Sequence, residues 1–279
     1  MAKSNKPAVG IDLGGTNMQI GVVGSDMKML GQAKKKTKAA DGAAAVLDRL
    51  VEGVHEALAA AKLTIKDVSC VGIGAPGAVD PGTGIVLEAV NLRWKNYPLA
   101  EVMTKRFGIP VFLDNDVNVA VWGEHQLGSG KGSRNMLGVW VGTGIGGGLV
   151  LNGELYYGHF MTAGEIGHVI ALPNNPPGHR SLEHNCSRTA VVDQIVRLVK
   201  ANRKSKITEL CEGNYDDIKS KMVAKAYEVG DEVVTEVIDH AAELLGIEIA
   251  GVVTLLSLER VVLGGGLTEA VGRPFVEKV

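Results

Sequence analysis

Cysteine is scarce in this sequence, and its scarcity narrows the possible chemistry. The 279 residues include three cysteines, Cys70, Cys186 and Cys211, which are widely spaced and odd in number. Neither a disulfide framework nor a cysteine-based zinc site is therefore indicated. We expect a reducing, cytoplasmic location.

The sequence also lacks a long apolar run and an excess of either charge. The longest apolar stretch, 244–258, is interrupted by Glu248 and is shorter than the roughly 20 residues that cross a bilayer, so it predicts a buried helix. No signal-peptide core precedes the first glycine turn. The 29 basic and 31 acidic residues nearly cancel, and the basic cluster at 34–36 is short and has no aromatic neighbours. Nucleic acid and membranes are therefore not expected partners.

The chain is long enough for two lobes, and its mixture of strands and helices predicts an α/β protein. Apolar runs at 8–13 and 18–23 flank the turn GGTN and predict a β-hairpin. Apolar residues at helical spacing predict a helix over 42–62 that covers a sheet. Further elements are expected as strands at 70–74 and 111–113, an extended segment or hairpin at 85–90, and a helix at 99–107.

The second half of the chain repeats the pattern of the first. MLGVWVGTGIGGGLVLNGELY predicts a strand, a glycine turn, a strand, an Asn-Gly turn and a strand, much as AVGIDLGGTNMQIGVVGSD does near the N-terminus. This repeat indicates a diverged duplication, with a first lobe over 1–117 and a larger second lobe over 118–279. Helices are then expected at 188–201, 219–229 and 232–257, and a last strand at 260–263.

Two glycine turns and a cluster of acids are the candidate binding elements. In DLGGTN (12–17) and GTGIGGG (142–148), backbone N–H groups can approach a phosphate closely, although either motif alone is equally typical of a tight hairpin. Neither turn matches the Rossmann or P-loop pattern. Between them, VFLDNDVNVAVWGE (111–124) places two acids and an amide directly after an apolar run. These three residues either bind a ligand or cap a helix over 117–128.

The order of the motifs resembles one known family. DLGGTN, GAPGAVD, NLRW, LDNDVNVAVWGE, GTGIGGG, GEIGH and LGGG follow one another as in the ROK sugar kinases, bacterial glucokinases in particular, and the resemblance runs from Val9 to about Leu267. It implies a two-lobed ribonuclease H-like (actin-like ATPase) fold with duplicated βββαβα lobes and a cleft between them. The expected activity is ATP-dependent phosphorylation of a hexose, glucose to glucose 6-phosphate.

Three alternatives to a glucokinase stay open. One is a kinase for fructose, N-acetylmannosamine or allose, and another is a glucokinase that uses polyphosphate as donor. A third is a non-catalytic, sugar-binding regulator. Regulators of this family carry a DNA-binding module ahead of the first glycine turn, and eleven residues precede Asp12, so we expect no such module here.

The resemblance implies a role for individual residues. Asp116 would be the general base, ionised at neutral pH with an ordinary Asp pKa of roughly 4, and Asp12 would hold Mg²⁺ through water. The nucleotide would be bound by Asp12, Gly14, Gly15, Thr16, Asn17, Thr143, Gly144, Gly264, Gly265 and Gly266. The sugar would be bound by Gly77, Asn91, Asn115, Asp116, Glu165, His168 and Glu183.

The sequence departs from the family pattern where family members bind a structural zinc through three thiolates and the histidine of GE-x-GH. The three cysteine positions are occupied here by Asn174, Pro176 and Ser181, so zinc is not expected. An improvised site made by His179, His184 and Cys186 is the minority alternative.

The other departure concerns the end of the chain. Family members continue past the GGG segment and return to the first lobe, whereas this chain stops at Val279, so we expect either a truncated or a naturally short form. Relatives are commonly dimers or tetramers, and the resemblance therefore implies a homodimer or homotetramer.

Overall fold

The first glycine turn joins two antiparallel strands, as its sequence predicts. In the computed structural model, which describes residues 6–279, β1 (Ala8–Leu13) and β2 (Asn17–Val23) pair along their full length. A third strand, β3 (Met29–Lys36), pairs with the other side of β2. The basic cluster lies on this edge strand, where lysines are common because they discourage pairing with another chain.

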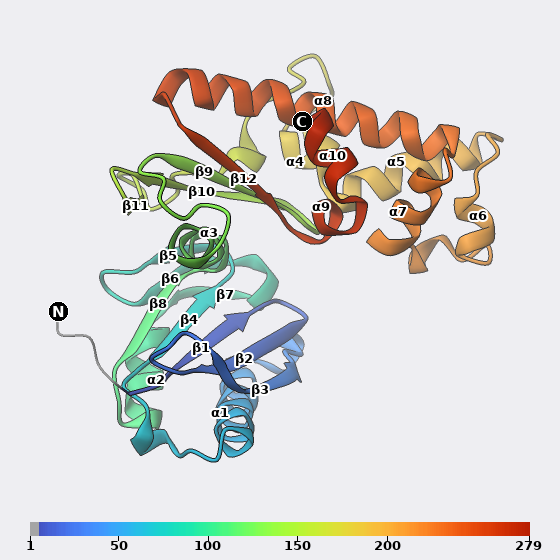
Figure 1. The fold of residues 1–279 in the computed structure, drawn as a ribbon. Helices are drawn as coiled ribbons and strands as arrows, with labels where there is room; N and C mark the ends of the chain where they lie inside the picture. Colours follow the sequence, from blue (N-terminus) through green and yellow to red (C-terminus); the bar gives the residue numbers. More distant parts are fainter. Residues whose placement is uncertain (1–5) are drawn as a thin grey trace. The chain divides into compact units, whose positions relative to one another are not determined.

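Two parallel strands complete the main sheet of the N-terminal unit (Figure 1). β4 (Val71–Ala75) lies beside β1, and β8 (Val111–Asn115) lies beside β4, which gives the order β3-β2-β1-β4-β8. The helices α1 (Ala43–Ala60) and α2 (Leu99–Phe107) share an apolar core with these strands. Because β1, β4 and β8 are parallel, their carboxyl ends meet at one edge of the sheet.

A smaller antiparallel sheet occupies the region where the sequence predicts an extended segment or hairpin at 85–90. Its strands are β5 (Ala78–Asp80), β6 (Ile85–Ala89) and β7 (Trp94–Tyr97), and a short turn of 3-10 helix, Val90–Leu92, follows β6. The expected strand was therefore found, but its two partners were missed. Runs of three and four residues are too short to show a clear alternation of apolar and polar side chains.

The C-terminal unit repeats the strand order of the N-terminal unit. β9 (Met136–Val141), β10 (Ile145–Leu151) and β11 (Glu154–Tyr156) form an antiparallel meander, and β12 (Arg260–Gly264) pairs in parallel with β9. The order β11-β10-β9-β12 corresponds to β3-β2-β1-β4. Asn152 and Gly153 both have positive φ, as the Asn-Gly turn requires. The repeat seen in the sequence is thus a repeat in topology.

Helices make up most of the C-terminal unit. The expected long helices are α5 (Arg188–Lys200), α7 (Ser220–Glu228) and α8 (Glu232–Leu256). The sequence analysis missed four short helices, α4 (Leu182–Cys186), α6 (Ile207–Leu210), α9 (Gly266–Val271) and α10 (Arg273–Lys278). α8 begins where the Asp231 side chain accepts a hydrogen bond from the Val234 N–H at 2.9 Å. Its apolar residues belong to one core with α4, α5 and α10.

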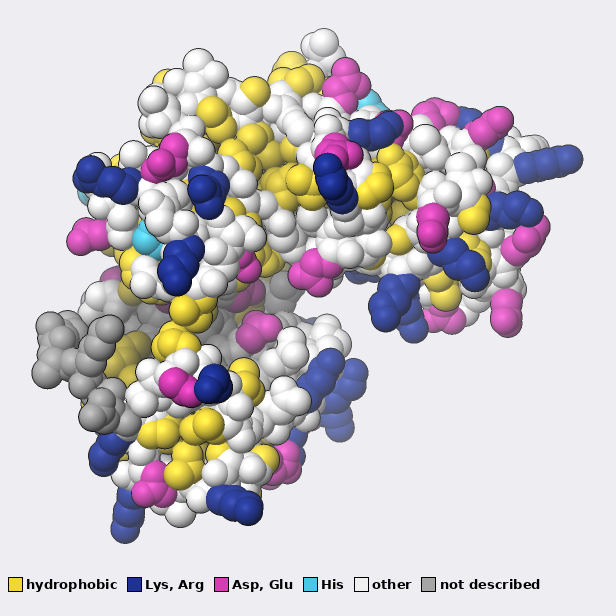
Figure 2. All heavy atoms as spheres, in the orientation of Figure 1, with side chains coloured by type: hydrophobic (Ala, Val, Ile, Leu, Met, Phe, Trp, Pro, Cys, Tyr) yellow, Lys and Arg dark blue, Asp and Glu magenta, His cyan; other side chains and the backbone are white. Residues whose placement is uncertain are grey.

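The chain divides into two compact units between Ala120 and Val121, inside helix α3 (Asp116–Leu127). Each unit has its own apolar core. On the face drawn in Figure 2, acidic and basic side chains are interspersed within each unit, unlike the stripe of basic residues that is typical of nucleic-acid binding. None of the helices among residues 6–279 is long and apolar enough to cross a membrane.

Helix α1 offers a test of the N-terminal core. Leu50 is fully buried, so Leu50→Ala should lower the free energy of unfolding by about 2–5 kcal/mol through lost burial and a residual cavity. Urea denaturation followed by circular dichroism measures this change. His55→Ala, on the exposed face of the same helix, is the control and should change stability by less than about 0.5 kcal/mol. Equal losses in the two variants would contradict this packing.

Candidate functional site

Acidic residues that are distant in sequence meet at the carboxyl edge of the N-terminal sheet. Asp12 on β1 is in register with Gly74 on β4, which is in register with Asp114 on β8. Asn115 ends β8, and Asp116 begins α3. In open α/β sheets, ligands bind outside the carboxyl ends of parallel strands. The acids therefore lie where this fold class places its binding sites.

Asp116 and Asp12 influence each other electrostatically. Burial of the Asp116 carboxyl raises its pKa, the negative charge of Asp12 raises it further, and a hydrogen bond from the Val117 N–H opposes both effects. Burial also raises the pKa of Asp12, against a hydrogen bond from Gln19, its cross-strand neighbour. The ordinary pKa expected for Asp116 is therefore corrected upward, which makes this carboxylate a stronger base. Gln19 was missed because only the strand register reveals it.

Asn115 has the capping role that the sequence left open for this cluster. Its Oδ1 accepts hydrogen bonds from the N–H groups of Val117 at 2.9 Å and Asn118 at 3.1 Å. Its Nδ2 donates to the Gly77 carbonyl at 3.0 Å. Since a side-chain amide has two N–H donors, one remains for a ligand. Asp116 Oδ1 also accepts from the Val117 N–H, at 2.9 Å. Capping and ligand binding are thus compatible here.

The first glycine turn is packed directly against Asn91. A Cβ placed on Gly15 would lie 2.9 Å from Asn91 Cβ, and one on Gly14 would lie 2.8 Å from the Asn17 carbonyl oxygen. Neither glycine has positive φ, so close approach rather than an unusual backbone angle is what requires glycine at this turn. The contact brings together a residue expected to bind phosphate and one expected to bind sugar.

Gly77 is constrained in both backbone angle and space. Its φ is +86°, and an added Cβ would lie 2.2 Å from the Glu88 carbonyl oxygen. Only glycine therefore fits here, and its carbonyl accepts the hydrogen bond from Asn115. The turn before β5 is in this way tied to the carboxyl end of β8.

In the C-terminal unit, the second glycine turn is packed against Glu183. The carboxylate of Glu183, on α4, accepts a hydrogen bond from the Ile145 N–H at 2.8 Å. A Cβ on Gly144 would lie 2.2 Å from Glu183 Oε2, and Thr189 Oγ1 donates to the Thr143 carbonyl at 2.8 Å. A pocket of about 680 Å³ is lined by Thr143, Glu183 and residues of α5. Glu183 thus supports the second glycine turn and also lines this pocket.

The remaining predicted residues of this unit fall into two places. Glu165 Oε2 lies 3.9 Å from His168 Nε2 across a turn of 3-10 helix, so these side chains share one face, as their spacing indicates. Gly264 ends β12, and Gly265 has a φ of +90° with an added Cβ 2.6 Å from the Val141 N. Gly266 begins α9.

The loop that carries zinc ligands in the resembled family is held here by amide hydrogen bonds. Asn185 Nδ2 donates to the carbonyls of His179 at 3.0 Å and Ser181 at 2.8 Å, and Asn175 Nδ2 donates to the His179 carbonyl at 3.1 Å. Ser181 Oγ is hydrogen-bonded to His184 Nδ1 at 2.7 Å. The contacts of Asn185 and His184 join the loop to α4, and the Asn175 contact lies within the loop.

The side chains at this loop do not fit a structural zinc. Asn174 and Pro176 offer no thiolate or imidazole, and burial raises the pKa of the Cys186 thiol to about 12, which disfavours the thiolate that binds metal. The rings of His179 and His184 lie 6.4 Å apart. Within the described part of the chain, no group of three or more His, Cys, Asp or Glu side chains is placed to hold a metal ion.

Comparison with known proteins identifies the family. The model of the ROK family matches residues 8–278. The chain belongs to the ROK family. A glucokinase from Halalkalibacterium halodurans is 31% identical over 276 residues, which cover 96% of this chain and 82% of that protein. The crystal structure of a ROK family glucokinase from Streptomyces griseus, in complex with glucose and AMPPNP, superposes with a TM-score of 0.85 at 30% identity, covering 98% of this chain and 88% of that one.

Regulators of the ROK family share the same architecture. The structure of a ROK family transcriptional regulator, a homologue of the E. coli MLC protein, has a TM-score of 0.83 at 26% identity, and the match covers 99% of this chain and 70% of that one. The expected two-lobed, actin-like ATPase fold is confirmed by these structures. Fold alone does not separate kinase from regulator.

The raised pKa of Asp116 predicts a stability that depends on pH. In the folded state its carboxyl group favours the proton, so its ionisation at neutral pH costs stability, and this cost disappears as pH falls through the raised pKa toward 3.8. Asp116→Asn should therefore raise the melting temperature at pH 7, on the order of 2 °C, and the gain should shrink as pH falls through the raised pKa and be absent below about pH 4. Differential scanning calorimetry across pH measures both.

Asp67→Asn is the matched control with the opposite sign. Hydrogen bonds from Thr64 lower the pKa of Asp67, so its charge stabilises the fold above the ordinary pKa, and this stability is lost as pH falls through the lowered pKa. The control should melt lower than wild type at pH 7. A lower melting temperature for Asp116→Asn at pH 7 would contradict the burial argument.

The hydrogen-bonded loop predicts indifference to metal chelation. Protein incubated with EDTA and then desalted should keep its melting temperature within about 1 °C, because no zinc–ligand bonds are expected to contribute to folding. Elemental analysis of the same sample should give well under one equivalent of zinc. Stoichiometric zinc, or a large fall in melting temperature after chelation, would contradict the expectation.

Proposed function

We propose that this chain transfers the γ-phosphoryl group of ATP to a hexose hydroxyl, with glucose as the acceptor. The observation that carries the proposal is the position of Asp12 and Asp116 at the carboxyl edge of the sheet, where the Asp12 charge raises the pKa of Asp116, in a chain whose relatives include glucokinases. Phosphoryl transfer depends on placing the two substrates and neutralising charge, and it needs an acceptor for the hydroxyl proton. The two carboxylates divide these tasks.

Asp116 acts as the general base. Partial burial and the neighbouring Asp12 charge raise its pKa. The carboxylate of Asp116 therefore binds a proton more strongly than an ordinary Asp does. It accepts the proton of the attacking hydroxyl as that oxygen becomes acidic in the transition state. The hydrogen bond from the Val117 N–H occupies Oδ1 and fixes the orientation of the side chain, so Oδ2 is the expected proton acceptor.

Asp12 would hold the Mg²⁺ ion of the nucleotide through water molecules. Asp12 lies near the carboxyl end of β1, and Mg²⁺ prefers oxygen ligands while keeping much of its hydration, so a single carboxylate suffices. When bound there, the ion would supply charge neutralisation for the transferring phosphoryl group. Backbone N–H groups of the turn at Gly14, Gly15, Thr16 and Asn17 bind phosphate oxygens, as do those at Thr143 and Gly144. The segment Gly264–Gly266 borders the adenosine.

The sugar is bound by groups that donate and accept hydrogen bonds. In the N-terminal unit these are Asn91, the Gly77 backbone and the free N–H of Asn115. In the C-terminal unit they are Glu165, His168 and Glu183. A wrong epimer leaves one of these groups without a partner, and an unpaired polar group is penalised strongly. These residues therefore determine which hexose is used.

The proposal is tested by an ADP-release assay over a panel of hexoses, with ATP and with polyphosphate as donors. Wild type should turn over fastest with glucose and ATP. Asp116→Asn should lower kcat at least about a hundredfold, because general base catalysis contributes about 10²- to 10⁴-fold. Asp114→Asn, which alters the neighbouring carboxylate, is the matched control and should retain kcat within about tenfold.

Each other outcome has a distinct meaning. If the enzyme prefers another hexose or polyphosphate, the proposed acceptor or donor is wrong but the proposed mechanism stands. A folded wild type that binds sugar but transfers no phosphate supports the regulator. An Asp116→Asn enzyme as fast as wild type removes Asp116 from the chemistry.

The homodimer or homotetramer implied by the family stays a prediction. Light scattering after size-exclusion chromatography measures the mass that tests it.

A further inference from the structure

A buried threonine holds the first glycine turn from behind. Thr37 follows β3 and is fully shielded from solvent. Its Oγ1 donates a hydrogen bond to the Gly14 carbonyl at 2.6 Å, and its N–H donates to the Thr16 carbonyl at 2.9 Å. One residue therefore fixes two carbonyl groups of a turn that is three residues long, and nothing in the spacing of the sequence points to it.

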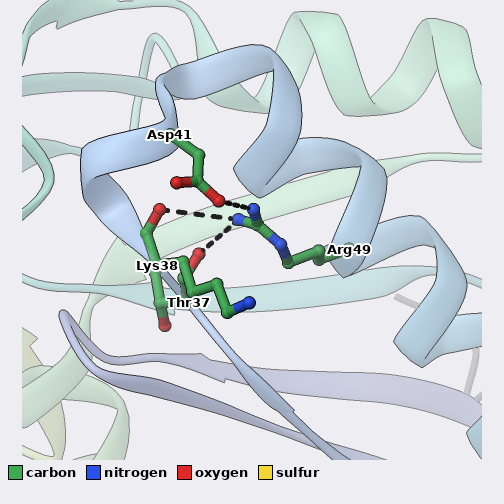
Figure 3. A network of polar contacts seen from close by, with 4 residues as sticks. All are labelled: Thr37, Lys38, Asp41 and Arg49. Carbon is green, nitrogen blue, oxygen red and sulfur yellow. Dashed lines mark hydrogen bonds and ion pairs between the residues drawn. The ribbon is translucent and has the colours of Figure 1, made fainter.

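Arg49 braces Thr37 from helix α1 (Figure 3). Its Nη1 donates to the Thr37 carbonyl at 2.7 Å and to the Lys38 carbonyl at 3.5 Å. Its Nη2 forms an ion pair with Asp41. The guanidinium thus joins the end of β3 to helix α1, which packs on the sheet. Its bonds to Thr37, Lys38 and Asp41 also fix the short segment Thr37–Asp41 that connects the two elements.

These contacts determine the direction of a backbone N–H group. The carbonyl of Gly14 and the N–H of Gly15 belong to one peptide group, which is planar and trans, so they point in opposite directions. When Thr37 binds the Gly14 carbonyl, the Gly15 N–H is directed away from Thr37. A turn that binds phosphate needs its N–H groups turned toward the anion before it arrives, and a fixed peptide supplies this arrangement.

We propose that Thr37, braced by Arg49, is a positioning residue for nucleotide phosphate, acting through the Gly14–Gly15 peptide. The inference rests on the proposed function, because it takes this turn as a phosphate-binding element. Thr37 itself is buried and touches no substrate. A threonine with only a packing role would affect stability alone, whereas a positioning residue affects the nucleotide selectively.

The test compares Thr37→Val with wild type by steady-state kinetics and by calorimetric titration with Mg-ADP. Valine keeps the shape of the side chain and removes the hydroxyl, so the Gly14 carbonyl loses its donor. The KM for ATP and the Kd for Mg-ADP should rise about fivefold or more, the factor that one lost hydrogen bond corresponds to, while the KM for glucose stays within about twofold. Thr37→Ser keeps the hydroxyl and should restore both nucleotide constants.

Two further variants provide a control and a second, independent test of the proposal. Thr64→Val removes another threonine hydroxyl of the same unit, one that bonds Asp67, and should leave both KM values unchanged. Arg49→Lys keeps the positive charge but cannot bind the Thr37 carbonyl and Asp41 in the same fork, so it should raise the nucleotide constants in the same direction. This variant tests the proposal even where Thr37→Val does not fold.

The results that overturn the proposal are distinct from those that overturn the proposed function. Unchanged nucleotide constants in Thr37→Val, an equal rise in both KM values, or a fall in melting temperature alone would reduce Thr37 to a packing residue. A wild type that transfers phosphate to no hexose would overturn the kinase assignment instead. The Mg-ADP titration still measures the role of Thr37 in that case.

Discussion

The parallel pairing of β1, β4 and β8 is the constraint on which the candidate site depends. Each strand contributes its carboxyl end to the same edge of the sheet, and the register places Asp12, Gly74 and Asp114 in one row. About a hundred residues separate Asp12 from Asp116 in sequence, and the sheet removes that separation. Gly74 contributes by lacking a side chain: an added Cβ would lie 3.2 Å from Asp116 Cα, so the start of α3 can approach β4 closely.

Placing two carboxylates near each other has an energetic cost that function explains. Like charges raise each other's affinity for protons, and partial burial adds to this effect at Asp116. A site built only for stability would contain a paired or neutral side chain here. The arrangement suits a divalent cation and a hydroxyl proton, both of which carry positive charge to the carboxylates. Under the proposed function, the protein loses some stability at this edge and gains a base and a cation ligand.

Sequence reasoning reached the long elements, whereas the site residues that it names stay a prediction. Helices such as α2 and α8 and the two glycine turns carry periodic or compositional signals, and the predicted bounds 99–107 of α2 are those observed. Strands β5 and β7 and helices α4, α6, α9 and α10 are too short to repeat a pattern. Gln19 and Thr37 were missed because the sequence does not show how the strands pair. Their contacts cross between strands, and only the register of the folded sheet brings them to Asp12 and Gly14.

Glu183 shows how one side chain can serve two needs. Its bond to the Ile145 N–H orients the carboxylate before any ligand arrives, so a bound sugar would not have to freeze that side chain. The same bond gives the second glycine turn an acceptor for one of its amides. Removing the carboxylate would therefore delete the proposed sugar contact and loosen the turn at once. Activity lost on substitution of Glu183 would combine the effect of the lost sugar contact with the effect of the loosened turn. Only a double-mutant cycle with a turn residue would separate these two effects.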